Sequence, residues 1–290
     1  ALNSEDLDLL KADIWTMSPP CQPFTRQGKK LDLNDKRTDS FQNIMHLLTK
    51  VNSLPKAILL ENVKGFEISE AKSKFTDILT HLNYNIQDYL INPLQYGIPN
   101  SRLRYYCLGV LQPNSAFESR PLQTHLPSEE CSTSEPVERR KIAEFLEESN
   151  NLLENNPYSE YLLPEKLLGK QAEVLDIVTP ESKGSCCFTR AYGHYAEGTG
   201  SVLYCGSKEK LDHAFQISRT MTTPEKKSAV LRTLQLRYFT PKEICKLMGF
   251  PNSYDLPQDM SPKQLYRLIG NSINVDVVSS LFKHLYNKAF

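Results

Sequence analysis

The stretch that decides the fold is Asp13-Ile14-Trp15-Thr16-Met17-Ser18-Pro19-Pro20-Cys21-Gln22-Pro23-Phe24. Residues 14–17 are β-branched, aromatic or apolar, which predicts a short buried strand. The prolines that follow end this strand, because a proline nitrogen has no hydrogen to donate to a neighbouring strand. Cys21 is therefore expected on a stiff loop at the carboxyl end of a strand, where open α/β sheets bind ligands. Its thiol is a candidate nucleophile, and a small buried cysteine in a proline-rich turn is the alternative.

A second buried strand is predicted over residues 56–60, and it leads directly into Glu61-Asn62-Val63. Residues 38–50, between the two strands, carry apolar side chains with the spacing of one helix face. A strand, a helix and a strand within about fifty residues form a βαβ unit, whose strands run parallel. Cys21 and Glu61 are therefore expected at the same edge of one sheet.

Further elements follow from the same patterns. Residues 70–82 predict a helix, and residues 84–91 and 105–111 predict two strands. About a dozen residues join these strands, too few for a helical crossover, so they should pair antiparallel. Residues 4–11 resemble the end of a helix. Its apolar side chains, expected to be buried, are Leu7, Leu9 and Leu10.

The composition changes after Gln112. Residues 113–136 are rich in Pro, Ser, Thr and Glu, which predicts a linker or a partly disordered insert. Thr240-Pro241-Lys242-Glu243 has the residues of a helix start, with Thr as N-cap. The remaining expected elements are helices in residues 139–150 and 159–176, a strand in 230–238, and two helices in 262–290 around a turn at Gly270-Asn271-Ser272.

Charge and cysteine usage narrow the function classes. Lys plus Arg and Asp plus Glu both number 34, so a nucleic-acid partner would have to meet a local basic surface. Residues 26–37 are polar and basic, and they are predicted to form a mobile loop, either a solvated linker or a lid that closes over substrate. The seven cysteines lack C-x-x-C spacing, which argues against a disulfide framework or a zinc site and favours the cytosol or nucleus. No metal site, signal peptide or membrane span is expected.

A thiol, a carboxyl group and two guanidinium groups are the candidate chemical groups. If residues 102–104 are extended, Arg102 and Arg104 point to the same side. A thiolate adds to an unsaturated carbon, a carboxyl group donates a proton to a ring nitrogen, and arginine binds a carbonyl oxygen. A pyrimidine base extruded from a folded nucleic acid is one substrate that suits all three groups. Gly198-Thr199-Gly200 neither follows a strand nor opens a helix, so it does not predict a dinucleotide site.

Several motifs resemble those of the cytosine-5 methyltransferases. They are, in order, Pro19-Pro20-Cys21-Gln22, Glu61-Asn62-Val63, Arg102-x-Arg104 and Gly270-Asn271-Ser272. The chain is most similar to the branch of DNA-methyltransferase homologues that methylates tRNA-Asp. Three parts of this chain resemble the signature of that branch. They are Cys187-Phe188-Thr189 with Tyr192, Tyr195 and Gly198-Thr199-Gly200-Ser201; Ile98-Pro99-Asn100-Ser101-Arg102-Leu103-Arg104-Tyr105; and Leu236-Arg237-Tyr238-Phe239-Thr240-Pro241-Lys242-Glu243.

The resemblance implies a role for each motif. Cys21 would attack C6 of a cytosine in the anticodon loop of tRNA-Asp, at position 38. Glu61 would engage N3 and the exocyclic amine, and Arg104, supported by Arg102, would hold the base and its O2. C5 would then take a methyl group from S-adenosylmethionine. The residues expected near this cofactor are Ser18, Pro20, Asn271 and Ser272. The residues expected to contact substrate or place the loop are Gln22, Asn62, Cys187, Phe188, Thr189 and Tyr192.

The implied fold is α/β: a Rossmann-like S-adenosylmethionine-dependent methyltransferase domain with a smaller inserted target-recognition domain. Residues 1–112 would be catalytic, 113–261 would be the linker and recognition domain, and 262–290 would return to the catalytic domain. The family binds its cofactor at a glycine-containing turn tens of residues before the Pro-Cys loop, whereas only twenty residues, none of them Gly, precede Cys21 here. The catalytic domain is therefore expected to be N-terminally incomplete, with an exposed sheet edge, weak or absent cofactor binding and no turnover.

Two alternatives remain from the sequence. A DNA cytosine-5 methyltransferase would perform the same chemistry on DNA, but the Cys187 region and the short recognition insert argue against it. A truncated, non-catalytic RNA-binding form would retain tRNA without methylating it. The partner expected is tRNA, with DNA as the alternative, and the chain is expected to be a monomer of the cytoplasm or nucleus without a membrane association.

Overall fold

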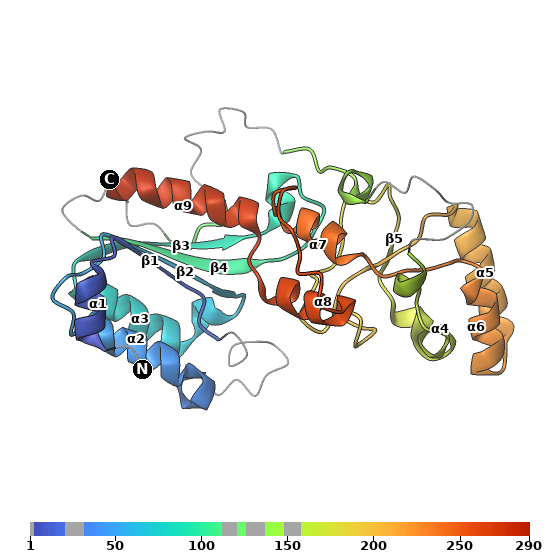
Figure 1. Ribbon diagram of the computed structural model, residues 1–290, viewed down its shortest axis with the longest axis horizontal. Coiled ribbons are helices and arrows are strands. Elements are labelled where there is room, and N and C mark those ends of the chain that lie inside the picture. The colour runs from blue at the N-terminus through green and yellow to red at the C-terminus, as the bar shows by residue number, and fades with distance from the viewer. Residues whose placement is uncertain (1–2, 21–31, 112–120, 126–136, 148–157) are drawn as a thin grey trace. The chain divides into compact units, whose positions relative to one another are not determined.

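The computed structural model describes residues 3–20, 32–111, 121–125, 137–147 and 158–290 (Figure 1). The chain divides into two compact units. Unit 1 comprises residues 1–92, 103–135 and 277–290, and unit 2 comprises residues 93–102 and 136–276. The assignment of catalytic and recognition domains is a functional division and stays a prediction.

A four-stranded mixed sheet forms the centre of unit 1, in the order β1-β2-β4-β3. The strands are β1 (Ile14–Met17), β2 (Ala57–Val63), β3 (Tyr84–Ile91) and β4 (Arg104–Leu111). β1 pairs with β2 in parallel, and β4 pairs antiparallel with both β2 and β3. The predicted βαβ unit and antiparallel pair are confirmed, and the α/β fold class is confirmed with them. β2 runs further than expected, so that Glu61 and Asn62 lie on the strand itself.

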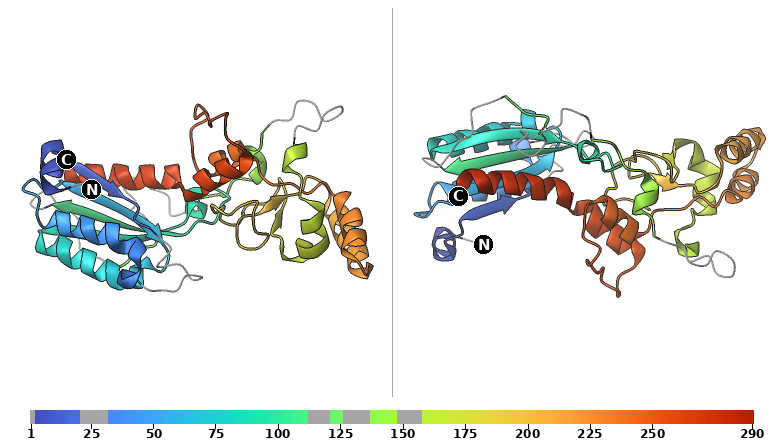
Figure 2. Two further views of the ribbon diagram at one scale, coloured as in Figure 1. Left: turned by 60° about the horizontal axis from the view of Figure 1, so that its bottom comes forward. Right: turned by 90° about the horizontal axis from the view of Figure 1, so that it is seen from above.

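Helices cover both faces of this sheet (Figures 1 and 2). α2 (Asp39–Leu48) and α3 (Glu70–His81) lie on one face, and α9 (Val275–Ala289) lies on the other. The α2–α3 face buries a cluster that includes Phe41, Phe75 and Tyr105. α9 buries a stripe of its own against the sheet, at Val277, Leu281, Leu285 and Ala289.

α1 (Ser4–Leu10) forms as expected, but its leucines do not pack as expected. Leu9 and Leu10 are 81% and 67% exposed. The helix is instead tied down by polar contacts, because the Asp8 carboxylate accepts hydrogen bonds from the backbone N–H groups of Asn52 and Ser53. β1 is the edge strand of the described sheet and is only partly buried, so the prediction of a buried strand at residues 14–17 is wrong in this respect.

The predicted loop at residues 26–37 lies outside the described residues as far as residue 31. From Asp32 onward it forms two short 3₁₀ turns, Asp32–Asn34 and Lys36–Thr38. The Asp32 carboxylate accepts hydrogen bonds from the N–H groups of Glu70 at 2.8 Å and Ala71 at 3.1 Å. Asp32 thus caps the first turn of α3 from a distant part of the chain. Hydrogen bonds from Arg37 lower the pKa of Asp35 to about 2.

Unit 2 consists of short elements joined by long irregular segments. Its 3₁₀ turns are Pro93–Tyr96, Ile142–Phe145, Ser159–Tyr161 and Ala172–Val174. Its helices and strands are α4 (Glu165–Gln171), β5 (Ile177–Val178), β6 (Val202–Leu203), α5 (Lys208–Thr220), α6 (Pro224–Arg232), α7 (Pro241–Leu247) and α8 (Pro262–Asn271). The helices expected in residues 159–176 and 262–290 are present. The expected α7 start is confirmed by a capping box between Thr240 and Glu243.

The helix predicted over residues 139–150 is wrong for its described part. Only Ile142–Phe145 forms a 3₁₀ turn, and residues 148–150 lie outside the described residues. The N–H groups of Ile142 and Ala143 donate to the carbonyl oxygens of Ser182 and Pro180, both at 2.9 Å. A backbone that donates to another segment cannot make helical hydrogen bonds, so the amphipathic pattern is overruled by tertiary pairing.

The strand predicted over residues 230–238 is also wrong. α6 occupies residues 224–232 instead, and it begins there because Thr223 caps its start and Pro224 takes the first helical position. The same combination of residues located the start of α7. α5, capped by Ser207, was not expected from the sequence. Of the predicted linker at residues 113–136, only residues 121–125 are described, and Gln123 makes an isolated bridge to Tyr89.

A buried ion pair joins two segments of unit 2. Arg237 makes two hydrogen bonds, both at 2.8 Å, to the Glu243 carboxylate, which is fully buried. The guanidinium also lies 4.2 Å from the centre of the Tyr158 ring. Glu243 in turn accepts the N–H of Thr240, so the pair fixes the start of α7. Both oxygens of the Glu243 carboxylate thus accept hydrogen bonds within the protein and are shielded from water.

We expect Arg237→Ala to destabilise the protein strongly, because it leaves the buried Glu243 carboxylate without its cation. The expected loss is about 3–5 kcal/mol of unfolding free energy. Arg219→Ala is the matched control, since it breaks an Arg–Glu pair whose side chains are 62% and 56% exposed. Urea unfolding followed by circular dichroism should give a much lower midpoint for Arg237→Ala and one near wild type for Arg219→Ala. Equal midpoints would contradict the assigned role.

Candidate functional site

Glu61 and Arg104 form an ion pair at one edge of the unit 1 sheet. The Arg104 Nε atom lies 3.4 Å from Glu61 Oε1, and both side chains are largely buried. Glu61 is the fifth residue of β2, and Arg104 is the first residue of β4. The structure therefore brings together the predicted carboxyl group and one of the two predicted guanidinium groups.

The strand register explains why these two side chains meet. Glu61 pairs with Tyr106, and Arg104 pairs with Val63, so the two charged residues are diagonal neighbours across an antiparallel pair. Side chains two residues apart share a face, which places both on the face opposite to Tyr105. Tyr105 belongs to the cluster under α2 and α3. Glu61 and Arg104 thus point away from that cluster.

Asn62 links the ends of β1 and β2. Its side chain is 1% exposed, its amide nitrogen donates to the Pro19 carbonyl oxygen at 3.4 Å, and its amide oxygen accepts the Val63 N–H at 2.8 Å. Pro19 is the second residue after β1. Asn62 was expected to contact substrate, but the structure places its amide against the backbone of the loop that leads to Cys21.

The predicted nucleophile is not among the described residues. Cys21 and Gln22 lie outside the described residues, while Ser18 and Pro20 are exposed at the end of β1. The parallel pairing of Met17 with Leu60 puts the start of this loop at the sheet edge where Glu61 follows. The geometric premise of the predicted site is thereby confirmed as far as Pro20.

Arg102 has different partners. Its side chain is 4% exposed, and its guanidinium donates to the carbonyl oxygens of Phe188 at 3.3 Å, Gly270 at 3.4 Å and Ser272. It also approaches the Cys187 sulfur at 3.5 Å. Arg102 therefore fastens the 187–188 segment to the Gly270-Asn271-Ser272 turn inside unit 2, and its predicted role at the base remains a prediction.

The Gly270 position requires glycine. A Cβ atom there would lie 2.2 Å from the Arg190 nitrogen and 2.3 Å from the Thr189 carbonyl carbon, distances that no side chain could tolerate. The end of α8 thus packs directly on the backbone of residues 189–190. Asn271, at the same turn, is exposed.

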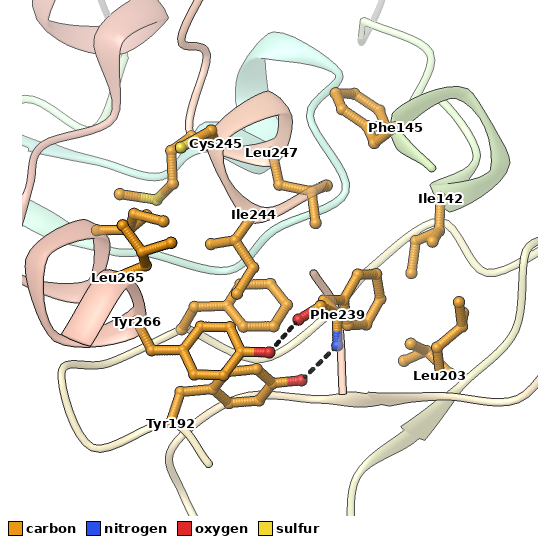
Figure 3. Packing of buried hydrophobic residues seen from close by; sticks show 14 of the residues in the cluster. Ile142, Phe145, Tyr192, Leu203, Phe239, Ile244, Cys245, Leu247, Leu265 and Tyr266 are labelled. Carbon is orange, nitrogen blue, oxygen red and sulfur yellow. Dashed lines mark hydrogen bonds between the residues drawn. The ribbon is translucent and has the colours of Figure 1, made fainter. Parts of the chain in front are cut away.

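Phe188 and Tyr192 lie in the hydrophobic core of unit 2. Figure 3 shows Tyr192 in this core, beside Tyr266 and Phe239. Phe188 and Tyr192 are 1% and 2% exposed, and their rings meet edge to face at 5.0 Å. The Tyr192 hydroxyl donates to the Ser201 carbonyl oxygen at 2.6 Å and accepts the Phe239 N–H at 3.0 Å. Burial raises the pKa of this hydroxyl well above its ordinary value. Both residues were expected to bind substrate, and direct contact would require this core to open.

The neighbouring polar residues are less buried. Cys187 and Thr189 are partly exposed, and the Thr189 N–H donates to the Thr199 carbonyl oxygen at 2.9 Å. Burial, together with a hydrogen bond to Asp176, raises the pKa of the Cys186 thiol to about 11. Cys186 therefore stays neutral near neutral pH and is a poor nucleophile.

Asn100 is a residue that the sequence reasoning did not single out. It is fully buried, and its amide nitrogen donates to Ser185 Oγ at 3.1 Å and to the Cys186 carbonyl oxygen at 2.9 Å. Ser185 Oγ donates in turn to the Pro99 carbonyl oxygen. Asn100 stands inside the motif quoted around Arg102, so its position in that motif was the available signal.

The residues predicted for the cofactor lie in both units, Ser18 and Pro20 in unit 1 and Asn271 and Ser272 in unit 2, and their role stays a prediction. Ser272 uses its hydroxyl on the Ile269 carbonyl oxygen and its own carbonyl on Arg102. One cavity of about 470 Å³ lies between α5 and α6, and another of about 180 Å³ lies beside α7. None of the four residues predicted for the cofactor lines either of these two cavities.

The described residues carry neither a candidate metal site nor a membrane-spanning helix. They contain no group of three or more His, Cys, Asp or Glu side chains placed to hold a metal ion. None of their helices combines the length and apolar character needed to cross a bilayer.

Comparisons with known proteins agree on the family to which this chain is similar. Residues 2–287 match the family model described as C-5 cytosine-specific DNA methylase. The human tRNA (cytosine(38)-C(5))-methyltransferase is 36% identical over 97% of this chain and 84% of its own length. The protein of the same name from Spodoptera frugiperda is 42% identical over 94% of this chain and 79% of its own length. A crystal structure of a Spodoptera frugiperda DNMT2 mutant superposes with a TM-score of 0.84, at 41% identity, over 98% of this chain and 82% of that chain.

Replacing the Tyr192 hydroxyl should destabilise the core. Tyr192→Phe leaves the Ser201 carbonyl and the Phe239 N–H without their partner, and about 1–3 kcal/mol of unfolding free energy should be lost. Tyr195→Phe, three residues on, is the control because that side chain is 61% exposed, and it should change stability by less than about 0.5 kcal/mol. Denaturant titration measures both variants. A Tyr192→Phe protein as stable as wild type would contradict the hydrogen-bond assignment.

Proposed function

The chain belongs to the C-5 cytosine-specific DNA methylase family, and we propose that it methylates C5 of a cytosine in tRNA through a covalent adduct of Cys21. The observation that carries this proposal is the arrangement at the edge of the unit 1 sheet. Glu61 and Arg104 are paired there, and Asn62 holds the backbone of Pro19 at the end of the neighbouring strand. Two peptide units separate Pro19 from Cys21, so covalent geometry limits the distance between the Cα atoms of these two residues to about 7 Å.

The proposed reaction is a conjugate addition followed by elimination. The Cys21 thiolate forms a bond to C6 of the cytosine, and the C5–C6 double bond becomes a nucleophile at C5. S-adenosylmethionine, when bound, supplies the methyl group that C5 takes. Loss of the C5 proton to a base and of the thiolate from C6 then restores the aromatic ring. The chain returns to its starting state with a free thiolate.

Glu61 and Arg104 are proposed to bind the cytosine ring during addition. A carboxyl group hydrogen-bonded to N3 and the exocyclic amine disperses the negative charge that addition at C6 places on the ring. The Arg104 guanidinium suits the O2 carbonyl oxygen as a planar donor. Their mutual ion pair holds both groups at the strand ends before a base arrives.

The choice of tRNA rests on the relatives. Two proteins named tRNA (cytosine(38)-C(5))-methyltransferase are 36% and 42% identical over nearly the whole of this chain. The signature around Cys187 favours the same branch, and with it the anticodon loop of tRNA-Asp as the target. A cytosine in duplex DNA is the second candidate, because the family's own description names DNA.

Trapping with 5-azacytosine tests the proposal. With S-adenosylmethionine present, a tRNA-Asp transcript carrying 5-azacytosine at the target position should form a complex that survives denaturing electrophoresis. The nitrogen that replaces C5 has no proton to lose after it takes the methyl group, so the thiolate is not eliminated from C6. Cys21→Ala should form none, while Cys205→Ala, which removes an exposed thiol outside the site, should behave as wild type. Adduct formation by Cys21→Ala would overturn the assigned nucleophile.

The same assay separates the alternatives. A duplex DNA carrying 5-azacytosine that is trapped faster than the tRNA would support a DNA methyltransferase. Binding of tRNA in native gels without any adduct would support a non-catalytic RNA-binding form. Adduct with tRNA alone, at the predicted base, would support the proposal.

Asn62 should act on the rate of addition rather than on binding. Asn62→Ala removes the contact with the Pro19 backbone, and a displacement of about 1 Å at the thiol can cost up to about a hundredfold in rate. We expect trapping to slow by at least about tenfold while the dissociation constant for tRNA stays within about twofold of wild type. A parallel loss of affinity, or an unchanged rate, would show that Asn62 does not position the loop.

A further inference from the structure

Two tyrosines of one turn in unit 2 have opposite environments. Tyr192 is 2% exposed and packs among Phe188, Tyr238 and Tyr266, with ring centres 4.9–5.2 Å away. Tyr195, three residues later, is 61% exposed. Its ring contacts only one aromatic neighbour in the described structure, His194, at 4.4 Å between centres and 65° between planes. The turn thus anchors one ring in the core and presents the other to solvent.

The backbone holds this presentation in place. The N–H groups of His194 and Tyr195 both donate to the Ala191 carbonyl oxygen, at 2.9 and 3.3 Å. Thr199 Oγ1 donates to the Tyr195 carbonyl oxygen at 2.8 Å. Gly193 has φ +74°, a conformation that side chains rarely adopt, and the Tyr266 ring lies 3.4 Å from the position of a Cβ atom there. An exposed ring on a fixed backbone can bind a partner at little cost in conformational entropy.

Cations occur in the turn that carries the pair and on the helix that packs against this turn. Arg190 begins the same turn, and α8, whose Gly270 packs on the Arg190 backbone, carries exposed Lys263 and Arg267. Residues 186–201 and 262–271 contain these three cations and one carboxylate, that of Glu197. In the described part of the chain, none of the three is engaged in an ion pair. A single exposed aromatic side chain is common on protein surfaces, but a fixed aromatic pair among unpaired cations matches a specific ligand chemistry.

That chemistry is the unpaired part of a nucleic acid. Unstacked bases in RNA loops bind by stacking on Tyr, Phe, Trp or His rings, and their phosphates bind to Arg and Lys. A protein partner that complemented these cations and rings would need a segment that is both acidic and apolar. If the partner were a protein, the two rings would not make the chain distinguish single-stranded from double-stranded RNA. The two rings and the three cations together favour the nucleic acid.

We propose that Tyr195, supported by His194 and flanked by Arg190, is a stacking platform for an unpaired base of the RNA substrate, other than the base that reacts. This inference rests on the proposed function, because it assigns part of the binding of that substrate. It assigns the platform to RNA recognition and not to the chemical step. The reacting groups stay those at the edge of the unit 1 sheet.

Equilibrium binding of the full chain to three RNAs tests the platform. The RNAs are an anticodon stem-loop, the same stem closed as a duplex without loop, and an unstructured single-stranded oligonucleotide, compared by fluorescence anisotropy. Loss of one stacked base weakens binding by about tenfold or more. Tyr195→Ala should therefore lose about tenfold in affinity for the stem-loop and the single strand, and little for the duplex. Tyr195→Phe, which keeps a ring, should stay within about twofold of wild type.

Tyr254→Ala is the matched control, since it removes a tyrosine of unit 2 that is 47% exposed elsewhere, and it should bind all three RNAs as wild type does. The platform is overturned if Tyr195→Ala binds the stem-loop as tightly as wild type, if its loss is equal for the duplex, or if wild type binds no RNA. The proposed function fails separately. If the tRNA is trapped covalently but its affinity does not depend on Tyr195, only the platform is contradicted. If binding depends on Tyr195 but no covalent complex forms, only the methyl-transfer proposal is contradicted.

Discussion

The parallel pairing of β1 with β2 is the constraint on which the candidate site depends. Parallel strands end at the same edge of a sheet, so the residues after Met17 begin beside the residues after Leu60. β4 runs the other way, and its first residue, Arg104, lies opposite Val63 at the end of β2. Two strand ends and one strand start therefore deliver a proline loop, a carboxylate and a guanidinium to one edge. A one-residue slip of β4 would turn Arg104 to the α2–α3 face.

In unit 2, hydrogen bonds from side chains fix the backbone of an irregular segment, whereas in unit 1 hydrogen bonds between strands fix the backbone. Residues 186–201 form no regular element, yet backbone carbonyl groups buried there need donors. Arg102 supplies donors to Phe188, Gly270 and Ser272, and the Tyr192 hydroxyl bridges Ser201 and Phe239. Each of these side chains serves two or more chain segments at once. The irregular segment is consequently fixed without a sheet, and the turn that carries Tyr195 takes its position from the core beneath it.

The sequence predicts those features that are decided locally. The βαβ order, the antiparallel β3–β4 pair and the Thr240 capping box depend on neighbours in the chain, and all are confirmed. The helix expected over residues 139–150 fails because its N–H groups donate to Pro180 and Ser182, some forty residues away. The pairing of Glu61 with Arg104 could be anticipated from the topology. The contact of Asn62 with Pro19 could not, since no pattern within the chain distinguishes an amide that binds a base from one that binds a carbonyl.

Residues of one motif can thus have separate tasks, and the contacts tell them apart. Arg102 and Arg104 stand two positions apart, but one binds carbonyl oxygens of its own unit and the other binds the Glu61 carboxylate. Tyr192 and Tyr195 divide in the same way between core and solvent. A buried guanidinium that donates to three backbone carbonyl oxygens is poorly placed to release them for a base. An ion pair at a strand end can exchange one partner for a substrate of similar charge pattern. This argument favours Arg104 as the arginine of the proposed chemistry and explains how Arg102 holds the 187–188 segment, while the predicted role of each at the base stays a prediction.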